Sequence, residues 1–161
     1  MRRFAVLMSA AAVVLATVTM FAQAKPSFAG KWTLVPDPNA AAAAGGGGRG
    51  RGFGMGNEFS VTQDDKTIVV TTMGQNGEQK TTYNLDGSES KNPLTFGGNT
   101  IERSSKIKLD AGKLVITTTS NFNGTPTETT QTWSLDATGN LVIEQSGRQG
   151  GAPTKTTYKK S

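Results

Sequence analysis

The chain has 161 residues, carries 17 lysines and arginines against 12 aspartates and glutamates, and has a formal net charge of +5. It contains no cysteine and no histidine. Their absence excludes disulfide bonds, a lipid anchor on an N-terminal cysteine, thiol or imidazole catalysis and the usual zinc and copper ligands. A domain of this length is large enough to be stabilised by a hydrophobic core alone.

Residues 1–24 have the organisation of a signal peptide. Residues 1–3 (MRR) supply a basic start, residues 4–21 form an uncharged apolar run, and residues 22–24 (AQA) have the small-x-small pattern of a cleavage site. The apolar run is also about long enough to anchor the chain in a bilayer, but the cleavage motif favours its removal. We therefore expect an exported protein, periplasmic or secreted, that starts at Lys25 and keeps no transmembrane segment.

Residues 25–161 are expected to form a single β-barrel domain with one alanine- and glycine-rich loop at residues 36–57. Part of this loop, GGGGRGRGFGMG (residues 45–56), is similar to arginine–glycine segments that bind RNA. It contains only two arginines, and removal of Arg2 and Arg3 with the leader lowers the net charge to +3, which is weak for binding a polyanion. We therefore expect no nucleic-acid partner and interpret the loop as flexible, either a lid over a ligand or a plain linker.

The remaining chain is dominated by threonine-rich and β-branched runs separated by turn residues. These runs predict strands at residues 28–35, 58–63, 67–72, 79–85, 100–109, 113–120, 127–135, 141–145 and 154–160. Short connections between successive strands allow only antiparallel neighbours, and about nine strands leave exposed edges unless the sheet closes on itself. We therefore expect an all-β fold, an antiparallel up-and-down meander closed into a lipocalin-like barrel of about eight or nine strands.

An internal repeat supports this fold, because one hairpin pattern occurs three times. Each copy begins with a polar turn and an apolar triplet, in QDDKTIVVTT (63–72), LDAGKLVITT (109–118) and LDATGNLVIE (135–144), and ends in a threonine-rich strand with one aromatic residue. The first apolar residue precedes the aromatic residue by 15, 19 and 17 positions, in the pairs Ile68 and Tyr83, Leu114 and Trp133, and Leu141 and Tyr158. Because these separations differ by even numbers, the aromatic side chains stay on the same face of the sheet.

The first predicted strand carries the pattern F-x-G-x-W at residues 28–32, and its Gly-x-Trp segment resembles the start of lipocalin-like (calycin-type) barrels. With the glycine-rich loop, LDGSESKN (85–92) and the final strand KTTYKK (155–160), it is also similar to small secreted bacterial β-barrel proteins that open with such a segment. The resemblance implies that Trp32 plugs one barrel end beneath an arginine of the last strand, where this chain has Lys159 and Lys160, and that Gly30 lets the backbones approach. Direct contact of Trp32 with a ligand is the alternative.

Four residues are candidate ligand contacts inside the barrel. Tyr83, Trp133 and Tyr158 occupy equivalent positions of the repeat, and each combines an apolar body with a polar tip. The same side chains could instead fill the core, because an eight-stranded barrel is just wide enough for side chains or one small ligand. Arg103, in the predicted strand 100–109, could bind a ligand carboxylate or lie on the solvated outer face.

Motifs for catalysis and metal binding are weak. No Gly-x-Ser-x-Gly elbow occurs. Residues 86–90 (DGSES) fit the Asp-x-Ser-x-Ser spelling of a Mg²⁺ site, but such a site needs a helix directly after the motif, and Pro93 follows here. We therefore expect a structured turn at residues 86–90, no metal site, no cofactor and no enzymatic activity.

Two functions remain open. The resemblance to lipocalin-like proteins implies an exported barrel that binds a small, partly apolar molecule. A filled barrel would instead act as an envelope or surface interaction module without a small-molecule ligand. The volume of the interior distinguishes the two possibilities, and the sequence leaves the oligomeric state open.

Overall fold

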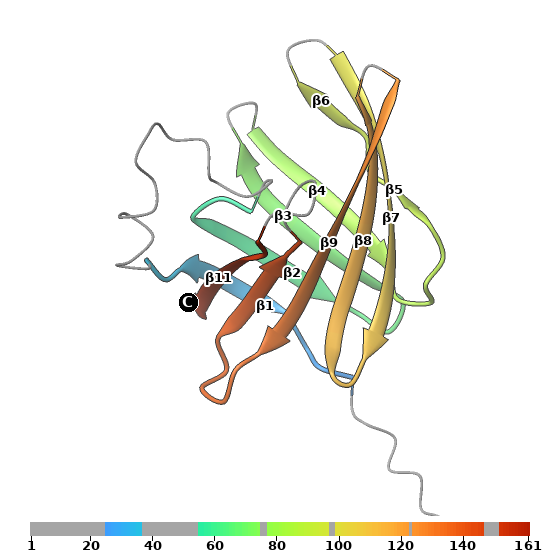
Figure 1. Ribbon diagram of the computed structural model, residues 1–161. Helices are drawn as coiled ribbons and strands as arrows, with labels where there is room; N and C mark the ends of the chain where they lie inside the picture. The colour runs from blue at the N-terminus through green and yellow to red at the C-terminus, as the bar shows by residue number, and fades with distance from the viewer. Residues whose placement is uncertain (1–24, 37–54, 75–76, 97–98, 123, 147–151) are drawn as a thin grey trace, which may run out of the picture.

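The computed structural model describes residues 25–36, 55–74, 77–96, 99–122, 124–146 and 152–161 (Figure 1). The predicted signal peptide lies outside the described residues, as does most of the predicted loop 36–57. In the described part of the chain, no helix has the length and apolar character needed to cross a membrane.

The described residues fold into antiparallel strands joined by turns. Their bounds are β1 (Gly30–Leu34), β2 (Glu58–Gln63), β3 (Thr67–Gly74), β4 (Gly77–Asn84), β5 (Ser90–Lys91), β6 (Leu94–Phe96), β7 (Asn99–Asp110), β8 (Lys113–Phe122), β9 (Thr125–Leu135), β10 (Leu141–Gln145) and β11 (Thr154–Lys160). The nine predicted strands all occur, with ends shifted by two residues or fewer. The two short strands β5 and β6 were not predicted, because Asn92 and Pro93 interrupt a run that is too short to show alternation.

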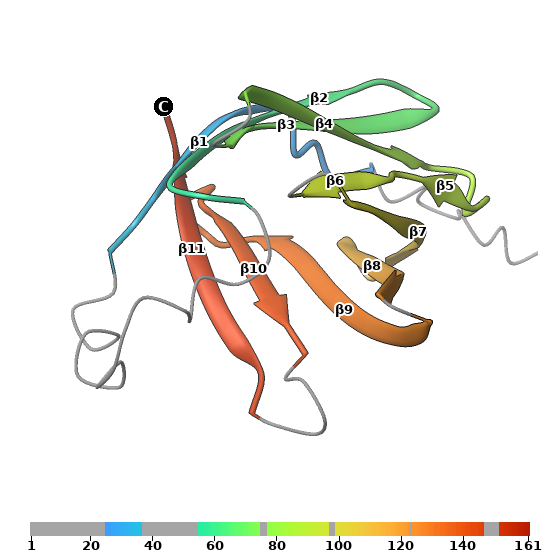
Figure 2. The same ribbon diagram turned by 90° about the horizontal axis from the view of Figure 1, so that it is seen from above.

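The sheet curls into a near-closed barrel (Figures 1 and 2). Its strand order is β4-β3-β2-β1-β11-β10-β9-β8-β7-β5, and β6 pairs with β7 beyond β5. The first and last strands are neighbours, with Trp32 opposite Lys160 and Leu34 opposite Tyr158. This arrangement confirms the predicted all-β antiparallel barrel, and its strand count is somewhat higher than predicted.

The two ends of this strand order, β4 and β5, meet at a seam that side chains close. The side-chain amide of Asn92 accepts a hydrogen bond from the backbone N–H of Thr82 (2.9 Å) and donates one to the Thr82 carbonyl (2.8 Å). The hydroxyl of Ser90 accepts a bond from the backbone N–H of Asn84 (2.9 Å). The edge of β4 is therefore satisfied here by side chains in place of a neighbouring strand.

The repeated hairpin is visible in the register of the sheet. In each copy, the first apolar residue of one strand lies directly opposite the aromatic residue of the next. The pairs are Ile68 with Tyr83, Leu114 with Trp133, and Leu141 with Tyr158. The even differences in spacing therefore preserve the inward face in all three hairpins, as predicted.

The hydrophobic core occupies the end of the barrel that carries the β7–β8 and β9–β10 turns, at the bottom of Figure 1. We call this the lower end. The largest fully buried side chains are Trp32, Trp133, Phe28, Ile68, Leu114, Ile116 and Leu141. All of them belong to one continuous cluster, so a packed floor closes the lower half of the interior.

Candidate functional site: the barrel interior

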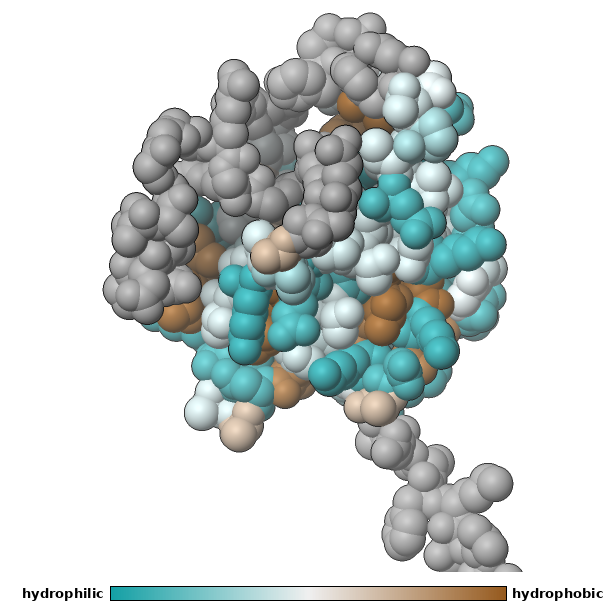
Figure 3. Space-filling model, viewed as in Figure 1, coloured by the Kyte–Doolittle hydropathy of each residue, from teal (hydrophilic) through white to brown (hydrophobic). Residues whose placement is uncertain are grey.

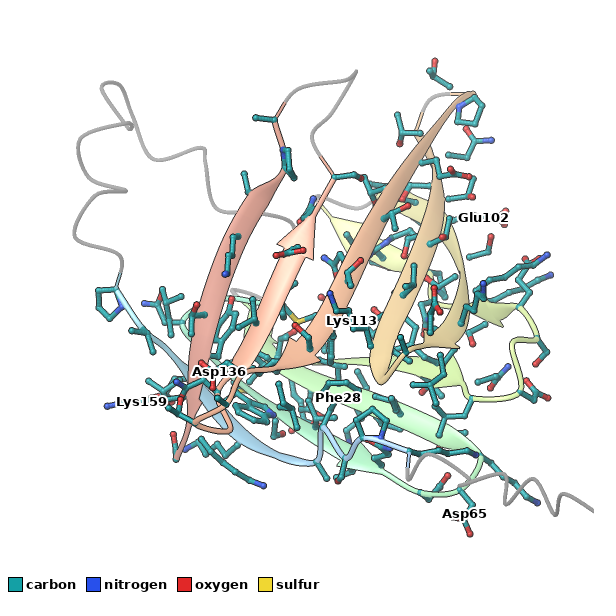
Figure 4. The ribbon with its side chains drawn as sticks, turned by 60° about the horizontal axis from the view of Figure 1, so that its bottom comes forward. Phe28, Asp65, Glu102, Lys113, Asp136 and Lys159 are labelled. Atoms are coloured by element: carbon teal, nitrogen blue, oxygen red, sulfur yellow. The ribbon has the colours of Figure 1, made fainter. Side chains whose placement is uncertain are left out.

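The segment before β1 closes the lower end of the barrel. Phe28, which is 1% exposed, turns inward and places its ring edge-on against Trp133, with ring centroids 6.0 Å apart. Figure 4 shows Phe28 at the end of the barrel that is turned forward in that view. Strand β1 therefore begins at Gly30 and not at Phe28 as predicted, because Phe28 packs as a plug outside the hydrogen-bonded ladder.

Two polar side chains hold this plug in place. Trp32 donates its indole N–H to the carbonyl of Phe28 (2.9 Å). The amide of Gln63 accepts a bond from the Phe28 backbone N–H (2.9 Å) and donates one to the Pro26 carbonyl (3.1 Å). The buried polar groups of the plug are therefore paired, which is the condition for burying them without loss of stability.

Gly30 and Trp32 lie together beneath the last strand. A Cβ atom at Gly30 would lie 2.6 Å from Cε of Lys160, and the backbone φ of +148° at Gly30 favours glycine. The Nζ atom of Lys160 is 5.8 Å from the centroid of the Trp32 ring, within the range of a cation–π contact. Lys160 thus occupies the place over the tryptophan where the lipocalin resemblance implies an arginine, and Trp32 is 1% exposed.

The three aromatic residues predicted to contact a ligand are buried in the packed floor. Tyr83, Trp133 and Tyr158 are 4%, 0% and 5% exposed. Phe59 lies between two of them, with its ring centroid 4.9 Å from that of Tyr158 and 6.3 Å from that of Trp133. Their packing leaves little surface for a ligand, so a role in binding stays a prediction.

Burial also affects the two tyrosine hydroxyls. Burial raises the pKa of Tyr158 above its ordinary value, and the Tyr158 hydroxyl donates a hydrogen bond to the Gly56 carbonyl (3.4 Å). Burial likewise raises the pKa of Tyr83, while the positive charge of Arg103 opposes this rise. Both phenols are therefore neutral at physiological pH.

Arg103 belongs to the inward-facing row of β7. It lies on the same face of the strand as the buried residues Ser105 and Ile107, two and four positions further along, and is opposite Ser120 of β8. Its side chain is half-buried, interacts with neighbouring groups, and is close enough to Tyr83 to influence the pKa of that phenol. Of the two placements left open for Arg103, the structure shows the interior one; contact with a ligand carboxylate stays a prediction.

Above the floor, the inward positions change from apolar to neutral polar residues. This polar wall consists of Thr81, Thr118, Thr129, Gln131, Gln145 and Thr156. The register assigns them to the interior, because each lies opposite another inward-facing residue: Thr81 faces Val70, Thr118 faces Thr129, Gln131 faces Gln145, and Thr156 faces Ile143. All but the buried Thr118 are partly exposed, so solvent reaches the wall but not the floor.

The polar wall retains hydrogen-bonding capacity. Trp133 donates to the side-chain carbonyl of Gln131 (3.3 Å), and the Gln131 amide donates over a long distance to Gln145 (3.5 Å). Thr118 shares a hydrogen bond of 2.9 Å with Ser105. The hydroxyls of Thr81, Thr129 and Thr156 make no hydrogen bond within the part of the chain that the structure describes, so they are available to water or a ligand.

No protein-family model and no curated protein matches this chain. Among solved structures, a mutant of the fluorescent protein UnaG superposes with a TM-score of 0.55 and 20% identity, over 83% of this chain and 96% of that one. The zebrafish ileal bile acid-binding protein, complexed with cholic acid, superposes with a TM-score of 0.51 and 23% identity, over 83% of this chain and 98% of that one. The fold is that of the calycin-type barrels.

Sequence reasoning missed the plug residue Phe28, the polar wall and the seam residue Asn92 of this calycin-type barrel. A signal for the wall does exist, because neighbouring threonines such as Thr129-Thr130 and Thr156-Thr157 must place one hydroxyl on each face of a strand. The sequence contains no signal for the role of Asn92, because an asparagine whose amide replaces a neighbouring strand looks the same in sequence as a loop asparagine.

The outer face of the barrel carries a separate shallow hollow of about 320 Å³ over β5, β7 and β8. Arg103, although it belongs to the inward row of β7, also borders this hollow, and the other lining residues are Glu89, Lys91, Pro93, Glu102, Ser104, Thr119 and Asn121. Apart from Arg103, its strand residues alternate with the inward-facing Ser90, Ser105 and Thr118, so the hollow faces solvent. Hydrophilic residues dominate the face seen in Figure 3, and its hydrophobic areas are small and separate.

The Asp-x-Ser-x-Ser segment forms a turn between β4 and β5. Asp86 accepts a hydrogen bond from the backbone N–H of Ser88 (2.8 Å), and Ser90 is used in the seam. Hydrogen bonds from Ser88 also lower the pKa of Asp86. These contacts account for the residue pattern, and no group of three or more acidic side chains in the described ranges is arranged to hold a metal ion.

Proposed function

We propose that this calycin-type barrel is exported and binds a small, partly apolar molecule in the upper half of its interior. One observation carries the proposal: the lower half is sealed by the Phe28 plug and a packed aromatic floor, whereas the inward side chains above it are polar and partly exposed. A binding site of this kind combines apolar surface with a few convergent polar groups.

The comparisons support the same proposal. The zebrafish neighbour is named for bile acid binding and its structure contains cholic acid. Its superposition extends over 83% of this chain. The predicted leader at residues 1–24 supports export.

A second function is favoured by the burial of the aromatic residues. Because Trp133 has no exposed surface and Tyr83 and Tyr158 have little, a filled barrel could instead act as an interaction module. Such a module would meet its partner with its outer strand faces, where the hollow over β5, β7 and β8 lies.

Native mass spectrometry of the protein from the envelope and culture fluid of its own host tests these alternatives. Export with leader cleavage predicts a chain that begins at Lys25. A binding barrel predicts a mass excess that is released as a small molecule on denaturation. An apo mass in every preparation, from a protein that unfolds cooperatively, would favour the interaction module.

The two tryptophans provide a second test in solution. In a Trp32→Phe variant the remaining reporter is Trp133, which is hydrogen-bonded to the wall residue Gln131. In a Trp133→Phe variant the reporter is Trp32, near the plugged end. Titration with cholate or a neutral amphiphile is expected to change the fluorescence of the first variant and leave that of the second nearly unchanged. Equal responses in both variants would contradict binding above the floor.

A further inference from the structure

We infer that the ligand is an uncharged amphiphile with a hydroxyl-rich head group, of which a glycoside is the simplest example. This inference rests on the proposed function and names the chemical class that the interior recognises. It follows from the kind of groups in the polar wall, from the charges near it, and from the position of apolar side chains beside it.

The wall is built largely from threonine doublets. Thr81-Thr82 on β4, Thr118-Thr119 on β8, Thr129-Thr130 on β9 and Thr156-Thr157 on β11 each place one hydroxyl inside the barrel and one outside, because side chains alternate along a strand. The inner members of the doublets belong to one polar region, in which Thr118 lies opposite Thr129. The amides of Gln131 and Gln145 complete this region.

Hydroxyl and amide groups both donate and accept hydrogen bonds. The hydroxyls of a sugar do the same, so a sugar can satisfy this wall without leaving an unpaired polar group. Three inner threonines, Thr81, Thr129 and Thr156, have hydroxyls that bond nothing else within the described residues, and the long contact between Gln131 and Gln145 (3.5 Å) is weak. Each of these groups gains a partner when such a head group binds.

A charged head group would be matched less well. No acidic side chain occupies an inward position of the described wall strands, because Glu78, Glu102, Glu128 and Glu144 all alternate with inward residues and face outward. A bound cation would therefore lack a counter-ion, which is costly away from water. An anion would have Arg103 to pair with on β7, whereas the available hydroxyls of Thr81, Thr129 and Thr156 lie on other strands, β4, β9 and β11.

The apolar part of the ligand has a separate contact surface. Leu94 of β6 lies opposite Ile101 of β7, and Ile101 belongs to the same inward row as Arg103 and Ser105. Both apolar side chains are partly exposed. Leu94 and Ile101 thus give the upper interior a small apolar patch beside Arg103 and Ser105, apart from the hydroxyls and amides of β9 to β11, which fits an amphiphile rather than a free sugar.

Four probes with the same eight-carbon chain test the inference: octyl β-glucoside, octyl sulfate, octanoate and octyltrimethylammonium. Each is titrated below its micelle concentration at neutral pH, by calorimetry with the purified protein. Because the tail is constant, differences in affinity report the head group. We expect the glucoside to bind about 25-fold more tightly than any charged probe, as two additional neutral hydrogen bonds of about fivefold each would produce.

The threonine doublets supply matched control variants. Thr129→Val and Thr156→Val remove inner hydroxyls at nearly constant volume, and each is expected to weaken glucoside binding about fivefold, the effect of one lost hydrogen bond. Thr130→Val and Thr157→Val make the same change on the outer face of the same strands and are expected to leave affinity unchanged. None of the four should alter octanoate binding.

The outcomes separate this inference from the proposed function. Tight octanoate or octyl sulfate binding with weak glucoside binding would overturn the hydroxyl-rich head group and leave the binding barrel standing. Equal effects of the inner and outer valine variants would also overturn it, since the wall would then play no part. Failure of every probe and of cholate to bind would overturn the proposed function as well.

Discussion

Lys160 of the last strand, β11, lies over Trp32 of the first strand, β1. Its Nζ atom is 5.8 Å from the centroid of the indole ring, while its aliphatic stem fills the space beside Gly30. The contact combines cation–π attraction with packing of the lysine stem beside Gly30. Three residues from β1 and β11 therefore form a single packing unit at the lower end of the barrel.

The backbone φ of +148° at Gly30 predicts that Gly30→Ala destabilises the protein by about 1–3 kcal/mol through backbone strain. The added Cβ would meet only the far end of the flexible, exposed Lys160 side chain, which can move aside. The same substitution should therefore have nearly the same effect in a Lys160→Ala background, and a double-mutant cycle measured by urea unfolding checks this. A much smaller effect in the Lys160→Ala background would mean that the lysine stem is held rigidly beside Gly30.

Trp32→Ala is expected to lower the free energy of unfolding by about 3–5 kcal/mol, because it leaves a large cavity in the floor. The change also removes the hydrogen bond that holds the Phe28 carbonyl. Trp32→Phe should have a smaller effect, since it keeps part of the buried volume but not the hydrogen bond. Denaturant unfolding measures both variants, provided that the slope of the unfolding free energy against denaturant concentration is unchanged. Wild-type stability of Trp32→Ala would overturn the end-plug assignment.

The seam predicts a local effect of Asn92→Ala. The substitution leaves the N–H and C=O groups of Thr82 without their side-chain partner, which should reduce stability by about 1–3 kcal/mol. Hydrogen exchange should accelerate most at the Thr82 amide. Asn121→Ala, at an exposed position of β8, is the control and should change neither quantity. Uniform acceleration across all strands would show that the seam is not a local unit.

The buried pair Ser105 and Thr118 predicts a non-additive result. Thr118→Val leaves the Ser105 hydroxyl unpaired and should destabilise the protein by about 1–2 kcal/mol. Adding Ser105→Ala removes the unpaired group, so the double variant should recover much of this loss. Thermal unfolding of both single variants and of the double variant measures the coupling between the two positions. Losses of stability that simply add in the double variant would contradict the prediction.

The raised pKa values of Tyr83 and Tyr158 predict a loss of stability in alkali. Because burial favours the neutral phenol in the folded protein, the unfolded chain releases protons first as the pH rises above about 10. The stabilising effect is complete below that pH and is lost as the pH rises through the folded-state pKa values. A double Tyr83→Phe/Tyr158→Phe variant should flatten the decline in stability above pH 10, measured by denaturant unfolding, and an unchanged slope would contradict it.

The fold was predictable because its signals are local. Alternation, turn residues and the even spacing of the repeat determine which residues of each hairpin face inward, and the observed pairs of Ile68 with Tyr83 and Leu114 with Trp133 follow from them. Most strand ends differ because a hairpin continues one or two residues further than predicted, whereas β1 starts late because Phe28 leaves the ladder. Such a departure depends on a partner distant in sequence, here Trp133, and no local pattern reveals it.

The candidate site was predicted less well, for a different physical reason. The repeat correctly grouped Tyr83, Trp133 and Tyr158, but periodicity cannot distinguish an inward residue in a packed floor from one beside accessible space. Exposure depends on how far along the barrel each residue lies and on what closes the end. The Phe28 plug and the side-chain seam determine this, and both are long-range features.

The pairing of β1 with β11 has a consequence for how the chain folds. Trp32 and Lys160 are opposite each other although 128 residues separate them, whereas β2–β4 and β7–β10 are joined by short turns. Local hairpins can form early. The pairing of β1 with β11, which joins the β1–β4 sheet to the β7–β11 sheet, comes later because it closes a loop that spans nearly the whole domain. Stopped-flow refolding should therefore show Trp32 reaching its native environment last, and the most persistent intermediate should be a pair of separate, half-curled sheets.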